Sequence, residues 1–122
     1  MREIKFRAWY KEDKVMSRRF TLENLQCGQG VLDDFNKMEI MQFTGLLDKN
    51  AKEIYEGDII KHQDEGERFE VYWSDINVSF KIIPISDKDI NQELEDITFC
   101  ENSKEFEVIG NIYENKDLLK GV

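Results

Sequence analysis

The sequence has a single proline, Pro84, and no long run of apolar residues among its 122 positions. A helix that crosses a membrane needs about 18 or more mostly apolar residues, so no membrane span is expected. The first residues, Met1–Arg7, alternate charged with apolar side chains, whereas a signal peptide has a continuous apolar stretch. We therefore expect a soluble protein of the cytoplasm.

Cysteine and histidine are also scarce, because Cys27, Cys100 and His62 are the only residues of these types. A structural zinc site needs about four ligands in known spacings, which these distant residues do not supply. Nothing places the chain in an oxidising compartment, so the two cysteines are expected to be free thiols. A histidine beside carboxylates such as Asp58 and Asp64 can act as a general base, but no nucleophile motif accompanies His62. We expect a surface histidine, and we predict no catalytic residue, no cofactor and no bound metal.

Positive charge is scarce outside the N-terminus. The chain has 17 basic and 26 acidic residues, a net charge of −9. Residues 1–20 hold seven basic and three acidic side chains, so residues 21–122 carry a balance of −13. An acidic body of this kind repels phosphate backbones, so direct nucleic-acid binding is not expected. The basic N-terminal ribbon is suited to dock on an acidic surface, either its own or that of another subunit.

Two acidic loops superficially resemble metal sites. Asp48, Asn50 and Glu53 resemble calcium ligands, but the loop lacks the register of an EF-hand, so a hairpin turn is favoured. The second loop, residues 64–67, is also expected to be an ordinary solvated turn.

The N-terminal residues have the period of a β-strand. From Glu3 to Lys11 the side chains alternate, and the polar turn that follows allows Val15–Phe20 to return antiparallel. This hairpin is expected to pack on something else, since an isolated hairpin is only marginally stable in water. One face would carry Ile4, Phe6, Ala8 and Tyr10, and the other would carry Lys5, Arg7 and Trp9.

Residues 21–38 are expected to be a connection with short helical pieces, because Gly28 and Gly30 soon stop any helix that begins there. The connection is the natural boundary between an N-terminal part, residues 1–38, and a C-terminal part, residues 39–122.

The C-terminal part reads as several short strands joined by polar turns, which is typical of a barrel or a sandwich. A capping box at Ser86–Asp89 predicts a short helix, and Asn115 is expected to cap a final turn. We expect Ile59, Val71 and Val108 in the core. The expected strands are residues 39–44, 53–55, 59–62, 69–73, 76–84, 98–101 and 105–113.

The segment Tyr55–Lys61 gives the clearest local signal. Gly57 permits a positive φ, which other residues adopt only at a cost. The β-branched pair Ile59 and Ile60 favours extended structure directly after it. The segment therefore predicts a tight turn that leads into a buried strand.

Three segments in order along the chain, Arg2–Trp9, Thr44–Ile59 and Phe106–Asn115, resemble the YopX family of small bacteriophage and prophage proteins. The resemblance covers essentially the whole chain. It implies a mainly β fold with a C-terminal SH3-like β-barrel, an N-terminal β-hairpin element and short helices. It implies no reaction, because the family is functionally uncharacterised. The family's usual Asn-Gly turn is Asn50 and Ala51 here. Alanine adopts a positive φ at a cost, so Asn50 is the alternative residue for that conformation.

Five side chains, those of Arg7, Trp9, Tyr55, Trp73 and Tyr113, are candidates for an interaction surface. Aromatic residues mostly pack in cores, but they also anchor protein interfaces and line the peptide grooves of SH3-like barrels. The Arg-Trp face of the N-terminal strand is chemically suited to an interface. Core packing and an interface role both stay open for these residues.

The sequence favours a non-enzymatic phage accessory protein in the host cytoplasm, a binding or assembly module whose partner is a host or phage protein. We expect a homo-oligomer formed through the N-terminal hairpin, unless the hairpin folds back onto its own barrel and covers Ile4 and Phe6. One alternative is an acidic inhibitor or DNA mimic that acts on a host nucleic-acid-binding protein. Another is a small metal-dependent hydrolase.

Overall fold

A computed structural model describes residues 4–21, 37–64, 66–76, 78–85 and 103–119. These residues form two four-stranded antiparallel sheets and short 3-10 turns, and none of them is α-helical. The mainly β prediction is therefore confirmed. Of the expected helical pieces, those in the 21–38 connection and at 86–89 lie almost wholly outside the described residues.

The first sheet has the strand order β2-β1-β3-β4. The predicted N-terminal hairpin is confirmed, with Trp9 opposite Met16. Its return strand is shorter than expected and continues only as an isolated bridge between Phe6 and Phe20. The strands are β1 (Phe6–Tyr10), β2 (Val15–Met16), β3 (Met38–Leu47) and β4 (Glu53–Tyr55).

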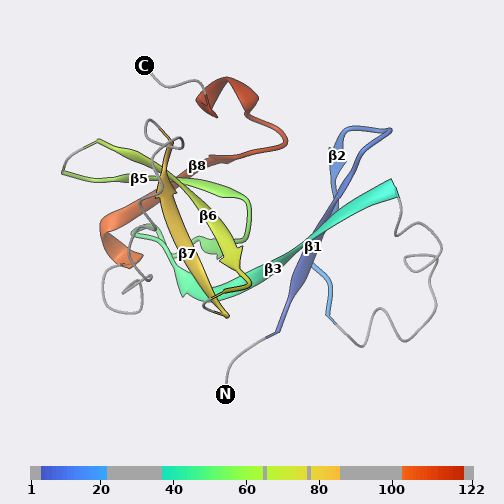
Figure 1. Cartoon of the computed structure of the whole chain (residues 1–122), viewed down its shortest axis with the longest axis horizontal. Helices are drawn as coiled ribbons and strands as arrows, with labels where there is room; N and C mark the ends of the chain where they lie inside the picture. Colours follow the sequence, from blue (N-terminus) through green and yellow to red (C-terminus); the bar gives the residue numbers. More distant parts are fainter. Residues whose placement is uncertain (1–3, 22–36, 65, 77, 86–102, 120–122) are drawn as a thin grey trace.

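The second sheet has the order β7-β6-β5-β8 and curls into a half-barrel (Figure 1). The expected strand 76–84 begins only at Ser79, so Ile76 and Val78 lie in the preceding turn and are exposed rather than inward-facing. The expected strand 98–101 lies outside the described residues. The strands are β5 (Asp58–His62), β6 (Arg68–Ser74), β7 (Ser79–Pro84) and β8 (Phe106–Asn111). The 3-10 turns η3 (Ser103–Glu105) and η4 (Lys116–Leu119) flank β8.

Strand β3 joins the two sheets. Its ten residues pair first with β1 and then with β4, and the register of the β4 pairing shifts between Phe43 and Leu47. Figure 1 shows β3 running from beside β1 toward the half-barrel. Its C-terminal half carries Leu46 to the core of the half-barrel. Because β1 pairs with five residues of β3, the hairpin shares its sheet with the C-terminal part of the chain.

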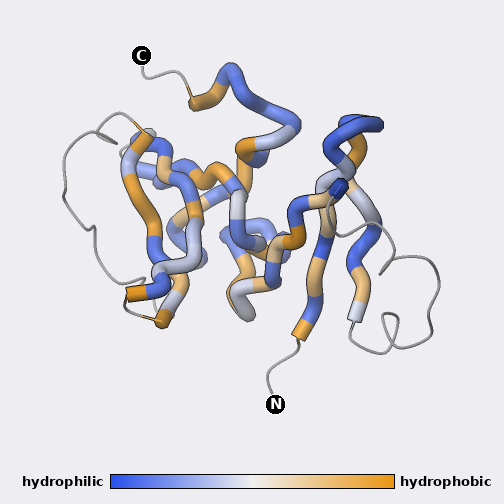
Figure 2. Tube along the Cα trace, turned by 45° about the vertical axis from the view of Figure 1, so that its right-hand side comes forward, coloured by the Kyte–Doolittle hydropathy of each residue, from blue (hydrophilic) through white to orange (hydrophobic). Residues whose placement is uncertain are grey.

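The core lies inside the half-barrel, where the orange and blue segments of the strands alternate (Figure 2). The predicted core residues Ile59 and Val71 are fully buried, and Val108 is half-buried against the same cluster. Many of the core residues are β-branched, which fits their place on the strands, because such side chains pack well on a pleated surface. The buried cluster consists of Ile54, Ile60, Val71, Ile82 and Phe106.

Two turns, one at Gly57 and one between β3 and β4, contain residues with a positive φ. Gly57 has a φ of +88°, as predicted, and a Cβ there would lie 3.1 Å from the Met41 sulfur. In the β3–β4 turn, Ala51 itself takes the positive φ, 63°, so the alternative of Asn50 in this conformation is wrong. The Asp48 carboxylate fixes that turn by accepting the N–H groups of Asn50 and Lys52, 2.8 and 2.9 Å away. The predicted hairpin turn is therefore confirmed.

Candidate functional site

A buried ion pair links the two sheets. Arg7 on β1 donates from Nη2 to the Asp58 carboxylate on β5, 2.6 Å away. The other Asp58 oxygen accepts the Tyr55 N–H at 2.8 Å, and the Arg7 guanidinium lies 4.8 Å from the centre of the Tyr55 ring. The Asp58 side chain is 1% exposed and that of Arg7 13%. The charged face of β1 therefore points inward, toward the second sheet.

Burial raises the pKa of Asp58, and the Arg7 charge and the Tyr55 N–H oppose that rise. Within the described residues the Arg7 Nε–H has no hydrogen-bond partner. A buried pair of this kind is costly to desolvate, but removing one partner alone costs more, because the other charge is left unpaired. The pair therefore fixes how β1 sits against the half-barrel.

A second set of charges surrounds Glu53 on β4. Its carboxylate is paired with Lys5, and with Arg19 at 2.5 Å, and it accepts the Tyr55 hydroxyl at 3.2 Å. Burial raises the pKa of Glu53, but the hydrogen bonds from Lys5 and Arg19 outweigh it, so the pKa lies below its ordinary value of 4.5. The first strand is thus held at two points along its charged face.

This arrangement predicts a pH-dependent contribution to stability. Because the pKa of Glu53 is lower in the folded than in the unfolded protein, its contribution is fully present above pH 4.5 and is lost as the pH falls below it. We expect the difference in unfolding free energy between wild type and Glu53→Gln to shrink from pH 6 toward pH 3. Urea denaturation across that range measures it, and a difference that stays constant would contradict the assignment.

Further along β1, Trp9 stacks on Tyr113, with ring centroids 5.6 Å apart and planes at 20°. Tyr113 lies just after β8, in a turn held by the Asn111 side chain. The Asn111 oxygen accepts the N–H groups of Tyr113 and Glu114, at 3.0 and 2.8 Å. The Asn111 side chain therefore places Tyr113 against Trp9.

Gly110 makes the same turn compact. A Cβ at this position would lie 2.5 Å from the side-chain oxygen of Asn115, which itself accepts the Asn111 N–H at 3.2 Å. No other residue fits without moving Asn115. The Phe106–Asn115 segment, singled out in the sequence, thus builds the support for Tyr113.

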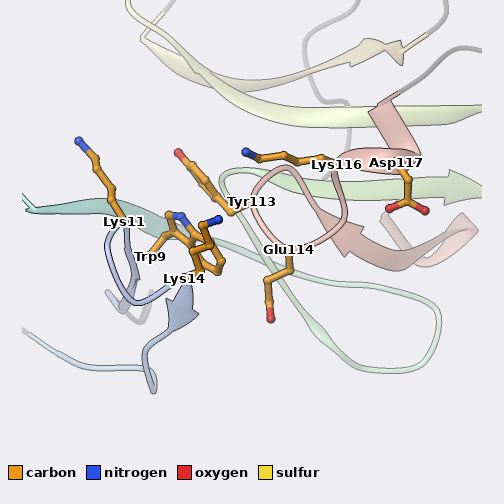
Figure 3. Close-up of a pocket in the computed structure, with 7 residues that line it drawn as sticks. All are labelled: Trp9, Lys11, Lys14, Tyr113, Glu114, Lys116 and Asp117. Carbon is orange, nitrogen blue, oxygen red and sulfur yellow. The ribbon is translucent and has the colours of Figure 1, made fainter.

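An open groove of about 740 Å³ lies beside the stacked rings, between the β1–β2 turn and the segment after β8 (Figure 3). Figure 3 shows Lys116 reaching toward Tyr113, with Lys14 beside Trp9 and Glu114 pointing the other way. We call this site the Trp9–Tyr113 groove. It is lined by Trp9, Lys11, Lys14, Tyr113, Glu114, Lys116 and Asp117.

The groove carries three lysines against two carboxylates, whereas the whole chain has a net charge of −9. Lys11 is paired with Glu39 at 3.0 Å, and both side chains are half-exposed. Burial raises the pKa of Tyr113, and the charges of Glu39, Glu56 and Glu70 raise it further. Tyr113 therefore stays a neutral hydroxyl at ordinary pH, set between an acidic flank and the lysines.

The structure brings four of the five predicted interaction residues together as two pairs, Arg7 with Tyr55 and Trp9 with Tyr113. Arg7 and Tyr55 lie inside the contact between the sheets, and Tyr55, only 4% exposed, is a core residue. Trp9 and Tyr113 line the groove, whereas Trp73 lies on β6, edge-on to Phe80 at 4.9 Å. The sequence did not single out the groove lysines. Lys11 and Lys14 belong to the basic N-terminal ribbon, which the sequence did indicate. Lys116 is marked in the sequence only by its position directly after the third motif, Phe106–Asn115.

His62 has structural contacts. Its Nδ1 accepts the Asp64 N–H at 3.2 Å, its Nε2 lies 3.5 Å from the Glu105 carboxylate, and its ring packs edge-on against Phe106. Cys27 and Cys100 fall outside the described residues. Within the described ranges, no three His, Cys, Asp or Glu side chains are grouped to hold a metal ion. A search of the same residues for a helix with the length and hydropathy of a membrane span finds none.

Comparison with known proteins assigns the chain to a family and supports its fold. No curated protein sequence matches the chain. Among solved structures it is similar to protein EF1440 from Enterococcus faecalis, at 23% identity and a TM-score of 0.62, over 98% of this chain and 100% of that one. That likeness supports the fold alone. The family described as YopX protein matches residues 5–120, which is nearly the whole length, and the chain belongs to the YopX family.

Proposed function

We propose that this protein is a non-enzymatic phage or prophage accessory protein, a binding module that holds an acidic segment of a partner protein in the Trp9–Tyr113 groove. The observation that carries the proposal is the gathering of Lys11, Lys14 and Lys116 around a stacked aromatic pair, in a chain that is otherwise strongly acidic. The partner is a host or phage protein in the host cytoplasm.

The chemistry of the groove favours an acidic peptide with apolar side chains. Flat faces of Trp and Tyr offer contact area at a low entropic cost, and they are enriched where proteins bind one another. Lysine ammonium groups around them attract carboxylates, and the lysine stems add apolar surface. A volume of about 740 Å³ lies within the range of about 300–1,000 Å³ that is usual for binding sites.

The half-barrel serves as the scaffold. Leu46 and Ile54, from β3 and β4, pack into the core of the curled sheet, which supports a closed SH3-like barrel over the C-terminal part. Peptide grooves of such barrels are commonly lined by aromatic residues. Here the N-terminal hairpin supplies Trp9, so the two parts build the groove jointly.

The test uses a hexapeptide in which isoleucine is flanked by acidic residues, and a control peptide in which each acid is the corresponding amide. Calorimetry should show that the acidic peptide binds and the amide peptide binds much less, with affinity falling as salt rises. The double variant K14E/K116E should bind the acidic peptide about tenfold more weakly or worse. Equal binding of the two peptides by the wild-type protein would overturn the proposal.

The matched control is K49E/K104E, which changes the net charge equally but lies outside the groove. It should bind as the wild type does. If both double variants lose affinity alike, the attraction comes from overall charge and the groove is not the site.

A second candidate, an acidic inhibitor of a basic host protein, is favoured by the carboxylates of Glu39, Glu56 and Asp75. Burial raises the pKa of Glu56, and the charges of Asp75 and Glu39 raise it further, so these groups are close together. This candidate predicts the opposite effect of the K14E/K116E substitutions on partner binding. K14E/K116E would retain a basic host protein at least as strongly as the wild type, in a salt-sensitive way.

A further inference from the structure

The turn between β6 and β7 exposes apolar side chains that the fold itself does not use. Ile76 is 84% exposed, Val78 70% and Trp73 38%, and these are three of the six large hydrophobic residues that are exposed in the described part of the chain. Figure 2 shows hydrophobic segments at this end of the half-barrel. We call Trp73, Asp75, Ile76 and Val78 the β6–β7 tip.

The backbone of the tip is strained as well as apolar. Val78 has a φ of 52°, a conformation in which a β-branched residue is an outlier. Glycine or asparagine would be the usual residue at such a turn position. Neither burial nor backbone preference explains valine here, and strain of this kind is found where a residue serves binding.

The strands beneath hold the tip in place. Trp73 and Phe80 are opposite each other in the β6–β7 ladder, with their rings edge to face at 4.9 Å, and the next pair, Ser74 and Ser79, closes the turn. Because these pairs fix the base of the tip, the tip loses less freedom on binding than an unsupported loop would.

The surroundings of the tip are acidic. Asp75 within the tip is exposed, and it lies close enough to Glu56 to raise the pKa of that carboxyl. An apolar projection with an acidic flank is the class of segment that the Trp9–Tyr113 groove is proposed to hold. The chain thus carries both a lysine-rimmed aromatic groove and an acidic apolar tip.

We propose that the β6–β7 tip of one molecule docks in the Trp9–Tyr113 groove of a second copy. The inference rests on the proposed function and names a partner for it. Ile76 and Val78 would contact the aromatic faces, and Asp75 would face the lysines. When each copy fills the groove of the other, the contacts close into a two-fold dimer; otherwise the same contact repeats from copy to copy. A contact this small is weak, so association is expected at high micromolar protein.

The test uses the full chain and two double variants, one altered in the tip and the other in the groove. In I76S/V78N, the tip loses its apolar side chains while asparagine suits the positive φ, so folding is retained. In K14E/K116E the groove is altered. Light scattering and sedimentation should show concentration-dependent association of the wild type and at least tenfold weaker association of each variant alone.

Mixing the two variants is the decisive step. An intact groove on I76S/V78N meets an intact tip on K14E/K116E, so the mixture should form one-to-one dimers that neither variant forms alone. A mixture that stays monomeric, or an I76S/V78N variant that associates as the wild type does, would overturn the inference.

The remaining outcomes separate this inference from its alternatives. If the acidic hexapeptide binds the groove but I76S/V78N associates like the wild type, the proposed function stands and the tip is not its partner. If I76S/V78N keeps full association and loses binding to vesicles of phosphatidylcholine and phosphatidylglycerol, the tip is a membrane contact and the inference is wrong. Denaturation of both variants confirms that each is folded.

Discussion

Replacing Arg7 with alanine is expected to lower the free energy of unfolding by about 3–5 kcal/mol at neutral pH. The side chain lies between the two sheets, 2.6 Å from the Asp58 carboxylate and above the Tyr55 ring. Its removal leaves a carboxylate that is 1% exposed without its cation. It also removes the guanidinium that lies over the Tyr55 ring. The variant should therefore lose the fixed position of β1 as well as stability.

Two further experiments, a second substitution and a change of pH, test whether the unpaired Asp58 charge causes the loss of stability. Adding Asp58→Asn to Arg7→Ala removes the unpaired charge and keeps an acceptor for the Tyr55 N–H, so R7A/D58N should be more stable than R7A. Because burial raises the pKa of Asp58, the cost of R7A should shrink as the pH falls and the carboxyl becomes neutral.

Guanidinium denaturation of R7A and R7A/D58N, beside the wild type, measures these differences. Lys11→Ala is the control, because the Lys11–Glu39 pair is half-exposed and should contribute no more than about 1 kcal/mol. If R7A costs no more than K11A, Arg7 does not join the sheets.

Replacing Asp48 with alanine is expected to cost about 2–4 kcal/mol. The carboxylate is 2% exposed and accepts three backbone N–H groups. Two lie within the β3–β4 turn, and the third is that of Val108 on β8, 2.9 Å away. Without it, the turn loses its brace and β8 loses a link to the first sheet, while the donors are left partly buried.

The measurement combines denaturation with hydrogen exchange at Val108. In D48A the Val108 amide should exchange faster relative to other β8 amides, whereas D48N should keep part of the protection through its remaining oxygen. Asn50→Ala is the control, because that exposed side chain makes only a 3.4 Å contact with Glu107 and should change stability by about 0.5 kcal/mol or less. Equal losses in D48A and N50A would show that the carboxylate is not the brace.

Much of the strand pattern could be predicted from the sequence because its causes are local. The alternation of side chains around Phe6–Tyr10 predicted the hairpin, and Gly57 predicted the positive φ. Each feature depends on only a few neighbouring residues. The β6–β7 turn was predicted wrongly. The alternation of Ile76 and Val78 with polar neighbours matches a strand, but the ladder closes at Ser74 and Ser79 and leaves both residues in the turn.

The contact between the sheets could not be predicted, because its partners are far apart in sequence. Arg7 and Asp58 are 51 residues apart, and Lys5 and Glu53 are 48 apart. Charge alternation indicated only that the N-terminal strand has a basic face. Nothing local indicates that this face is the buried one, because burial of charge depends on which carboxylates the fold brings opposite.

The aromatic residues of the candidate site could be predicted from the sequence, but its lysines could not. Trp9 and Tyr113 stood out as aromatic residues in the first and third motifs, but their stacking depends on the pairing of β1 with β3 and on the turn after β8. The groove lysines looked like ordinary solvated charges. Only their position around the two rings distinguishes them from the other lysines of the chain.

The most direct test of groove binding is an NMR titration of I76S/V78N with the acidic hexapeptide, because this variant lacks the apolar side chains proposed to occupy the groove of a second copy. The chain has two tryptophans, so the spectrum contains two indole N–H signals, one from the groove and one from β6. We predict that the Trp9 indole signal and the amides of Lys14 and Lys116 shift in a saturable way while the Trp73 signal stays in place. Saturable shifts at Trp73 with an unmoved Trp9 signal, or no saturable shift at either, would contradict a binding function for the groove.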